Sequence, residues 1–194
     1  MSRRDEELKS AHERAAGDRF IQAYNRRRGT RFTFREQRKP PAPDLVYATT
    51  RGRLLGVEVA TAYYDEGDAK TRWGPARGRD GGVWAGVDPT ENLAAFVSRL
   101  LAEKCAKSYE FSGPCILVVD ARPPLTDERD IKRTVLPAIS VPTAAPYSEI
   151  YLGVDLPISL RRPSAHEGQY RIWRLYPSGR RGGAPVPGSG FLVP

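Results

Sequence analysis

The 194-residue chain is poor in the residues that build metal clusters and disulfides: it has two cysteines, Cys105 and Cys115, and two histidines, His12 and His166. With so few ligands a zinc site is not expected, and the two cysteines are predicted to be reduced thiols. The chain also lacks an apolar run long enough to span a membrane, and its charged N-terminus lacks the apolar core of a signal peptide. These absences predict a cytoplasmic protein.

Acidic residues are in the minority, because 31 Lys and Arg against 23 Asp and Glu give a net charge of +8. A basic chain has affinity for polyanions without specifying their sequence, although a basic surface can also serve solubility alone. Basic residues gather early in the chain, where we predict contacts with a phosphate backbone. These residues are Arg26, Arg27, Arg28, Arg31, Arg35, Arg38 and Lys39.

Two short apolar runs, residues 45–48 and 54–60, flank a polar segment that contains Gly52. This pattern predicts a β-hairpin. Each run carries one acid where an apolar residue is expected: Asp44 at the entry of the first and Glu58 inside the second.

The turn of this hairpin decides whether Asp44 and Glu58 can meet. A two-residue turn at 51–52 would place them on opposite faces of the strands, whereas a three-residue turn at 51–53 places them on one face. They would then be diagonal neighbours, roughly 7–8 Å apart at Cα. We predict the second turn, with Gly52 at positive φ, because it also collects the apolar side chains on the other face. That apolar set is Leu45, Tyr47, Leu55, Val57 and Val59.

Carboxylates that converge from adjacent strands can hold one divalent cation. Hard oxygen ligands suit Mg²⁺ or Mn²⁺, which keep coordination positions for water and phosphate. Taken singly, Asp44 could instead cap its strand after Pro43, and Glu58 could be solvated or paired with an Arg. The two acids together predict a metal site.

The order of these residues resembles the PD-(D/E)XK nuclease superfamily, which is restriction-endonuclease-like and carries Pro-Asp on one strand and acid-x-Lys on the next. Pro43-Asp44 and Glu58-Val59-Ala60 match this pattern, and the element order matches over about residues 1–120. The resemblance implies that Asp44 and Glu58 hold the metal with help from the backbone carbonyl of Val59. Ala60 departs from the pattern, because it occupies the position of the Lys.

A helix beginning at Asp88-Pro89 has an N-cap and a first-turn proline. Its apolar stripe, continued at about 100° per residue, has Lys104 at its centre and Lys107 at its edge. Either Lys could supply the ammonium missing at Ala60. Lys107 also resembles the Lys that members of the superfamily can carry late in this helix. Each could instead extend into solvent and complement the helix C-terminus.

The remaining pattern alternates helices and strands. We predict a helix over about 4–28 with an interruption at 17–18, a strand at 31–37 and a buried strand at 114–120 whose Asp120 caps the next segment. A short helix at 126–136 and strands at 149–154 and 170–176 follow. The predicted fold is a single α/β domain over 1–194, with a mixed central sheet, an α-β-β-β-α-β core and extra C-terminal strands.

An acid of the first helix often completes the metal site in the resembling superfamily. Glu13 could do so, but nothing in the sequence separates it from Glu6 or Glu7, and each of the three could instead lie on a solvated helix face.

The long polar segment 65–87 follows the second hairpin strand directly. Its Arg72, Trp73 and Arg77 could stack on bases and contact phosphates, or the segment could be a mobile loop anchored by its Trp. Residues 177–194 form a Gly/Pro-rich tail.

The sequence therefore predicts a divalent-metal-dependent nuclease that hydrolyses nucleic-acid phosphodiesters, with Mg²⁺ or Mn²⁺ as cofactor. The expected partner is nucleic acid, DNA ahead of RNA, although no residue pattern distinguishes the two. The alternative is a catalytically inactive nuclease-like module that binds nucleic acid or protein, which Ala60 favours. A third reading is an unrelated α/β protein whose basic surface meets a protein.

Overall fold

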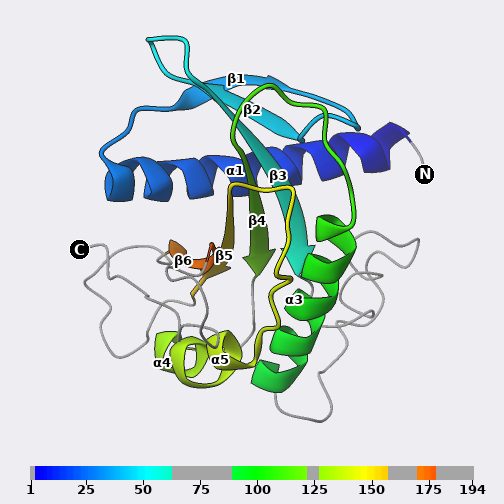
Figure 1. The fold of residues 1–194 in the computed structure, drawn as a ribbon, viewed down its shortest axis with the longest axis vertical. Helices are drawn as coiled ribbons and strands as arrows, with labels where there is room; N and C mark the ends of the chain where they lie inside the picture. The colour runs from blue at the N-terminus through cyan, green and yellow to red at the C-terminus, as the bar shows by residue number, and fades with distance from the viewer. Residues whose placement is uncertain (1–2, 63–88, 122–126, 157–169, 178–194) are drawn as a thin grey trace.

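Six strands form one sheet in which spatial order follows sequence order. The computed structural model describes residues 3–62, 89–121, 127–156 and 170–177 (Figure 1). The strands are β1 (Thr33–Gln37), β2 (Leu45–Ala48), β3 (Leu54–Ala62), β4 (Cys115–Ala121), β5 (Glu149–Asp155) and β6 (Tyr170–Tyr176). The helical elements are α1 (Arg3–Arg28), α3 (Pro89–Cys105), α4 (Glu128–Asp130), the π-helical turn η1 (Ile131–Val135) and α5 (Leu136–Ala138).

The sheet is mixed, which confirms the predicted α/β class. Strands β1, β2 and β3 form an antiparallel meander, β3, β4 and β5 run parallel, and β6 pairs antiparallel at the far edge. Every residue of β4 is buried, which explains its continuous apolar sequence, since a central parallel strand is covered on both faces.

Two apolar layers cover the faces of the sheet. Helix α1 crosses the strands and packs Phe20 and Ile21 against one face, while α3 packs Val97 and Leu101 against the other (Figure 1). Because side chains alternate along a strand, β3 and β4 contribute to both layers. Among the described residues, no helix is both long enough and apolar enough to cross a membrane.

Helix α1 runs without a break through Gly17 and Asp18, so the predicted interruption is wrong. A β-carbon at position 17 would overlap Cδ1 of Leu45 and lie 2.8 Å from the Tyr47 hydroxyl. The Tyr47 hydroxyl donates to Asp18 at 3.0 Å. The two residues that weaken the helix locally are therefore the ones that let it pack closely on β2.

Asp120 lies inside β4 and its side chain is fully buried, so it does not cap the next segment as predicted. Nη2 of Arg19, on α1, donates to both carboxylate oxygens at 3.1 and 3.3 Å. This ion pair ties α1 to the centre of the sheet.

Replacing Arg19 by Met is expected to lower the free energy of unfolding by about 3 kcal/mol, because the Asp120 carboxylate would stay buried without its cation. Asp120→Asn should cost less, since the Arg19 side chain is 26% exposed and can reach water. Urea denaturation measures both. Lys132→Met is the control, because it breaks only a surface pair with Glu128 and should cost less than about 0.5 kcal/mol. Equal costs for Arg19→Met and Lys132→Met would contradict this role of the buried pair.

Candidate functional site

The β2–β3 hairpin places Asp44 and Glu58 on one face, the arrangement that the three-residue turn predicted. The register pairs Leu45 with Val57, so Asp44, one residue before β2, lies directly opposite Glu58 rather than diagonally. The two acids are therefore closer neighbours than the predicted register allowed.

The turn itself is displaced by one residue from the prediction. The N–H of Thr49 donates to the Arg53 carbonyl at 3.0 Å, which leaves 50–52 rather than 51–53 as the loop. Gly52 has φ of 78° and its N–H donates to the Thr49 carbonyl at 2.9 Å. A tight turn that ends in a left-handed glycine is a common three-residue hairpin loop. The shift moves the pairing by two residues and so leaves every side chain on its predicted face.

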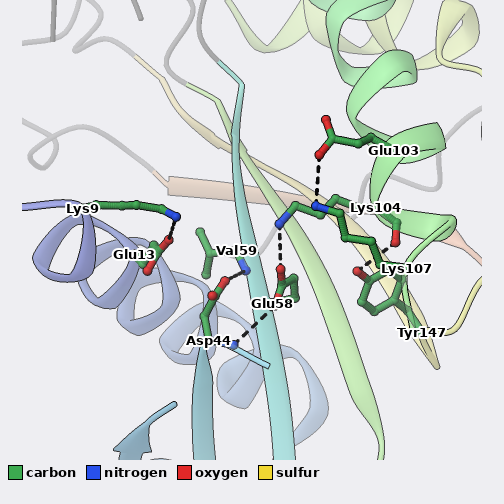
Figure 2. Close-up of polar contacts among 9 residues, drawn as sticks. All are labelled: Lys9, Glu13, Asp44, Glu58, Val59, Glu103, Lys104, Lys107 and Tyr147. Carbon is green, nitrogen blue, oxygen red and sulfur yellow. Dashed lines mark hydrogen bonds and ion pairs between the residues drawn. The ribbon is translucent and has the colours of Figure 1, made fainter. Parts of the chain in front are cut away.

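Backbone and side-chain donors surround the two carboxylates. The N–H of Val59 donates to Oδ2 of Asp44 at 2.9 Å, and the N–H of Asp44 lies 3.4 Å from Oε2 of Glu58. Nζ of Lys104, from the last turn of α3, donates to Oε1 of Glu58 at 2.7 Å (Figure 2). An ammonium from α3 thus lies beside the acid pair, although Ala60 occupies the position on β3 where the PD-(D/E)XK pattern has its Lys.

Of the two predicted lysines, Lys104 contacts the acid pair and Lys107 does not. Lys104 is 17% exposed, whereas Lys107 is half-exposed and pairs with Glu103 one turn earlier on α3 (Figure 2). Burial alone would lower the pKa of Lys104, but the hydrogen bond to Glu58 and the Glu58 charge outweigh it, and the pKa is raised. Lys104 therefore stays positively charged beside Glu58.

Strand β3 extends beyond its partner, because β3 has nine residues and β2 has four. The Val59 side chain belongs to the α1 layer, and its N–H points to Asp44 on the open edge. The N–H and C=O of a strand residue face the same side, so the Val59 carbonyl faces that edge as well. Two carboxylates and this carbonyl offer oxygen ligands to the same space.

A cavity of about 1100 Å³ opens over this edge of β3. Helix α1 contributes Glu13 to the cavity wall but neither Glu6 nor Glu7. The structure thus identifies which of these three acids lies near the site, which the sequence could not do. Burial raises the pKa of Glu13, Lys9 opposes this, and the Glu58 charge adds to it. Three other α1 residues in this wall were not predicted from the sequence, although their spacing places them on one helical face with Glu13. These are Asp5, Lys9 and His12.

In the part of the chain that the structure describes, no group of three or more His, Cys, Asp or Glu side chains is placed to share a metal ion. A cation at the β3 edge would therefore rely on Asp44, Glu58 and the Val59 carbonyl. Such a set suits Mg²⁺ or Mn²⁺, which bind through one or two carboxylates and retain water.

Burial raises the pKa of Asp44 to about 7, and repulsion from Glu58 and Glu13 acts in the same direction. The Val59 N–H and the Lys104 charge oppose the rise. One buried ammonium is therefore not enough to let Asp44 ionise as freely as it would in water, and a bound cation would favour its ionised form.

In the metal-free protein, the free energy of unfolding should fall as pH rises from the ordinary pKa of Asp44 to its folded pKa of about 7. Its folded pKa of about 7 exceeds the ordinary value of 3.8, so between these values the folded protein binds more protons than the unfolded chain. Relative to Asp44→Asn, the decline should be on the order of 2 kcal/mol between pH 5 and pH 8. Urea denaturation in EDTA measures it, and parallel pH profiles for the two proteins would contradict it.

Of the predicted nucleic-acid contacts, Arg38 and Lys39 directly precede Pro40 and Pro41 of the cavity wall, whereas residues 26–31 lie farther from the cavity and others lie beyond the described residues. Residues 26–28 form the last turn of α1, roughly 20 Å along the helix from Glu13. Arg28 pairs with Glu149 at the start of β5, and Arg31 is exposed just before β1. The predicted contacts Arg72, Trp73 and Arg77 belong to segment 65–87, which lies outside the described residues, as does the tail after 177.

The chain was also compared with protein-family models, curated proteins and solved structures. None of the three comparisons found a match. Function is therefore inferred from the residues that meet at the open edge of β3.

Proposed function

We propose that this chain is a divalent-metal-dependent nuclease that hydrolyses phosphodiester bonds of nucleic acids. The observation that carries the proposal is the contact between Lys104 of α3 and Glu58 of β3, directly beside Asp44. It joins two acids and one ammonium at the rim of a cavity. The resemblance of Pro43-Asp44 and Glu58-Val59-Ala60 to the PD-(D/E)XK superfamily, together with the order α1-β1-β2-β3-α3-β4, supports the same reading.

Each group has a role that its position supports. Asp44, Glu58 and the Val59 carbonyl would hold the metal. When bound, Mg²⁺ or Mn²⁺ would supply an activated water and neutralise charge on the phosphate. The Lys104 ammonium, which pairs with Glu58 in the metal-free protein, would stabilise the negative charge that develops on phosphate oxygens.

Nucleic acid is the proposed substrate because the chain is strongly basic and the cavity wall adds exposed cations to Lys104. Lys9 and Lys107 both line the cavity, and about half or more of each side chain is exposed to solvent. Contacts of this kind bind phosphate without reading bases, so we propose binding that is not sequence-specific, with DNA ahead of RNA.

One observation favours the alternative, a catalytically inactive module that keeps a nuclease-like scaffold. Lys104 already neutralises Glu58 through a short ion pair, so the acid has a cation without any metal. In that case the same surface would bind nucleic acid or protein but would not cleave.

Incubating the chain with supercoiled plasmid in Mg²⁺, Mn²⁺ or EDTA tests the proposal. Nicked or linear plasmid in either metal, and none in EDTA, is the expected result. A salt-sensitive gel shift without cleavage in either metal would instead support the inactive module. An absence of both binding and cleavage at low salt would leave only a protein partner for the basic surface.

A further inference from the structure

Strand β1 forms one edge of the sheet, and its basic residues lead directly to the cavity. Residues 31–42 contain four cations against the single acid Glu36. The last three of these cations are exposed, and they precede Pro40 and Pro41 of the cavity wall. They are Arg35, Arg38 and Lys39, which we call the β1 cations.

Arg38 lies in one row with the two acids of the site. The N–H of Arg38 donates to the Asp44 carbonyl at 2.9 Å, so the β1–β2 ladder extends to this pair. Opposite residues of an antiparallel ladder point to the same face, with about 5.5 Å between the Cα atoms of a hydrogen-bonded pair. Arg38, Asp44 and Glu58 are therefore successive neighbours on one face of the sheet. The acid pair thus has Arg38 next to Asp44, and Lys104 against Glu58.

The Arg38 guanidinium is accessible to an anion from solvent. It lies 6.0 Å from the centroid of the Phe111 ring and donates to Oε1 of Glu36 at 2.6 and 3.0 Å. The Arg38 and Glu36 side chains are 37% and 40% exposed, and ion pairs this exposed contribute little to stability. A guanidinium also matches two oxygens of a phosphate. A phosphate close to Asp44 can therefore draw Arg38 away from Glu36 at little cost.

The open edge of β1 is poorly suited to pairing with a strand of another protein. The register of β1 against β2 shifts between Phe34 and Glu36, which leaves Arg35 without a partner in the ladder. Bulges and charged side chains on an edge strand hinder the addition of a further strand. An exposed edge that carries cations and resists strand pairing suits a polyanion.

We infer that the β1 cations bind the phosphate backbone of the nucleic acid beside the acid pair, so that the bound strand leaves the cavity along the edge of β1. The inference rests on the proposed function, which places cleavage at Asp44 and Glu58. It divides the basic residues that cluster in the sequence, because it assigns the backbone contacts to β1 rather than to residues 26–28 in the last turn of α1.

Replacing all three β1 cations by Gln tests the inference, because it removes their charges and keeps the Arg38 N–H that pairs with Asp44. This triple variant is Arg35→Gln, Arg38→Gln and Lys39→Gln. A control triple variant changes the same number of cations on α4 and η1, at the opposite end of the molecule from β1 (Figure 1). The control is Arg129→Gln, Lys132→Gln and Arg133→Gln. The two sets are matched, because each contains one cation that pairs with a Glu.

Fluorescence anisotropy would measure the binding of a labelled DNA duplex, its single strand and polyglutamate in EDTA, where no metal-dependent cleavage takes place. Thermal melting checks that both triple variants fold. For the β1 triple variant we expect the affinity for the more tightly bound DNA to fall on the order of 100-fold at about 0.1 M salt. The slope of log affinity against log salt should fall by about 2 to 3, because each lost phosphate contact contributes about 0.7 to 0.9. The control should lose no more than a few-fold in affinity and keep the wild-type slope.

Equal losses in the two triple variants would overturn the inference, because net charge alone would then explain them. Wild-type affinity and slope in the β1 triple variant would overturn it as well. So would a wild-type protein that binds neither DNA, and its binding of polyglutamate would then indicate an acidic protein partner. DNA binding that depends on the β1 cations, in a protein that cleaves no plasmid in Mg²⁺ or Mn²⁺, would uphold this surface and refute the nuclease.

Discussion

Replacing Asp44 by Asn, or Glu58 by Gln, is expected to reduce metal-dependent cleavage on the order of 10³-fold, because each change removes a charged metal ligand. Both replacements keep the size of the side chain. Asp44→Asn should also raise the melting temperature of the metal-free protein at pH 8, since it removes a carboxylate that burial and Glu58 disfavour. Loss of activity together with a gain in stability is typical of a functional group that the fold accommodates at a cost.

Plasmid cleavage and thermal melting in EDTA measure the two effects on the same preparations. Glu128→Gln is the control, because Glu128 is an acid of α4 that pairs with Lys132. It should retain wild-type cleavage. Cleavage by Asp44→Asn and Glu58→Gln at the rate of this control would show that the acid pair does not hold the metal.

Lys104→Met is expected to reduce cleavage on the order of 10²-fold, because it removes the cation nearest the proposed phosphate position. Mn²⁺ affinity should rise at the same time, since the ammonium no longer competes with the metal for Glu58. Lys107→Met should change both quantities by no more than a few-fold, because Lys107 pairs with Glu103. Cleavage rates and Mn²⁺ titrations separate the two lysines.

The opposite result, in which Lys107→Met loses cleavage and Lys104→Met retains it, would contradict the assignment of the ammonium to Lys104. Weaker Mn²⁺ binding by Lys104→Met would contradict the proposed competition for Glu58.

The faces of the hairpin could be predicted from the sequence because alternation fixes them. Moving the loop from 51–53 to 50–52 changes the pairing by two residues and changes no face. The apolar pattern therefore determined that Asp44 and Glu58 point the same way. It could not determine that they lie directly opposite each other, because both loops satisfy the same alternation.

Helical periodicity similarly predicted Lys104 at the centre of the core-facing stripe, where the structure places it against Glu58. Periodicity could not choose among Glu6, Glu7 and Glu13, because the answer depends on where α1 crosses the sheet. The burial of Asp120 was missed for a related reason. Its partner Arg19 is 101 residues away in the chain, and no local pattern records such a contact.

A crystal structure of the protein soaked in Mn²⁺ tests the central claim most directly. We expect an anomalous peak at the open edge of β3, coordinated by Asp44, Glu58 and the Val59 carbonyl. The Lys104 ammonium should move from Glu58 toward the cavity as the metal takes its place. Crystals with no Mn²⁺ at this edge, and with the Lys104–Glu58 ion pair intact, would contradict the claim that this acid pair is a metal site.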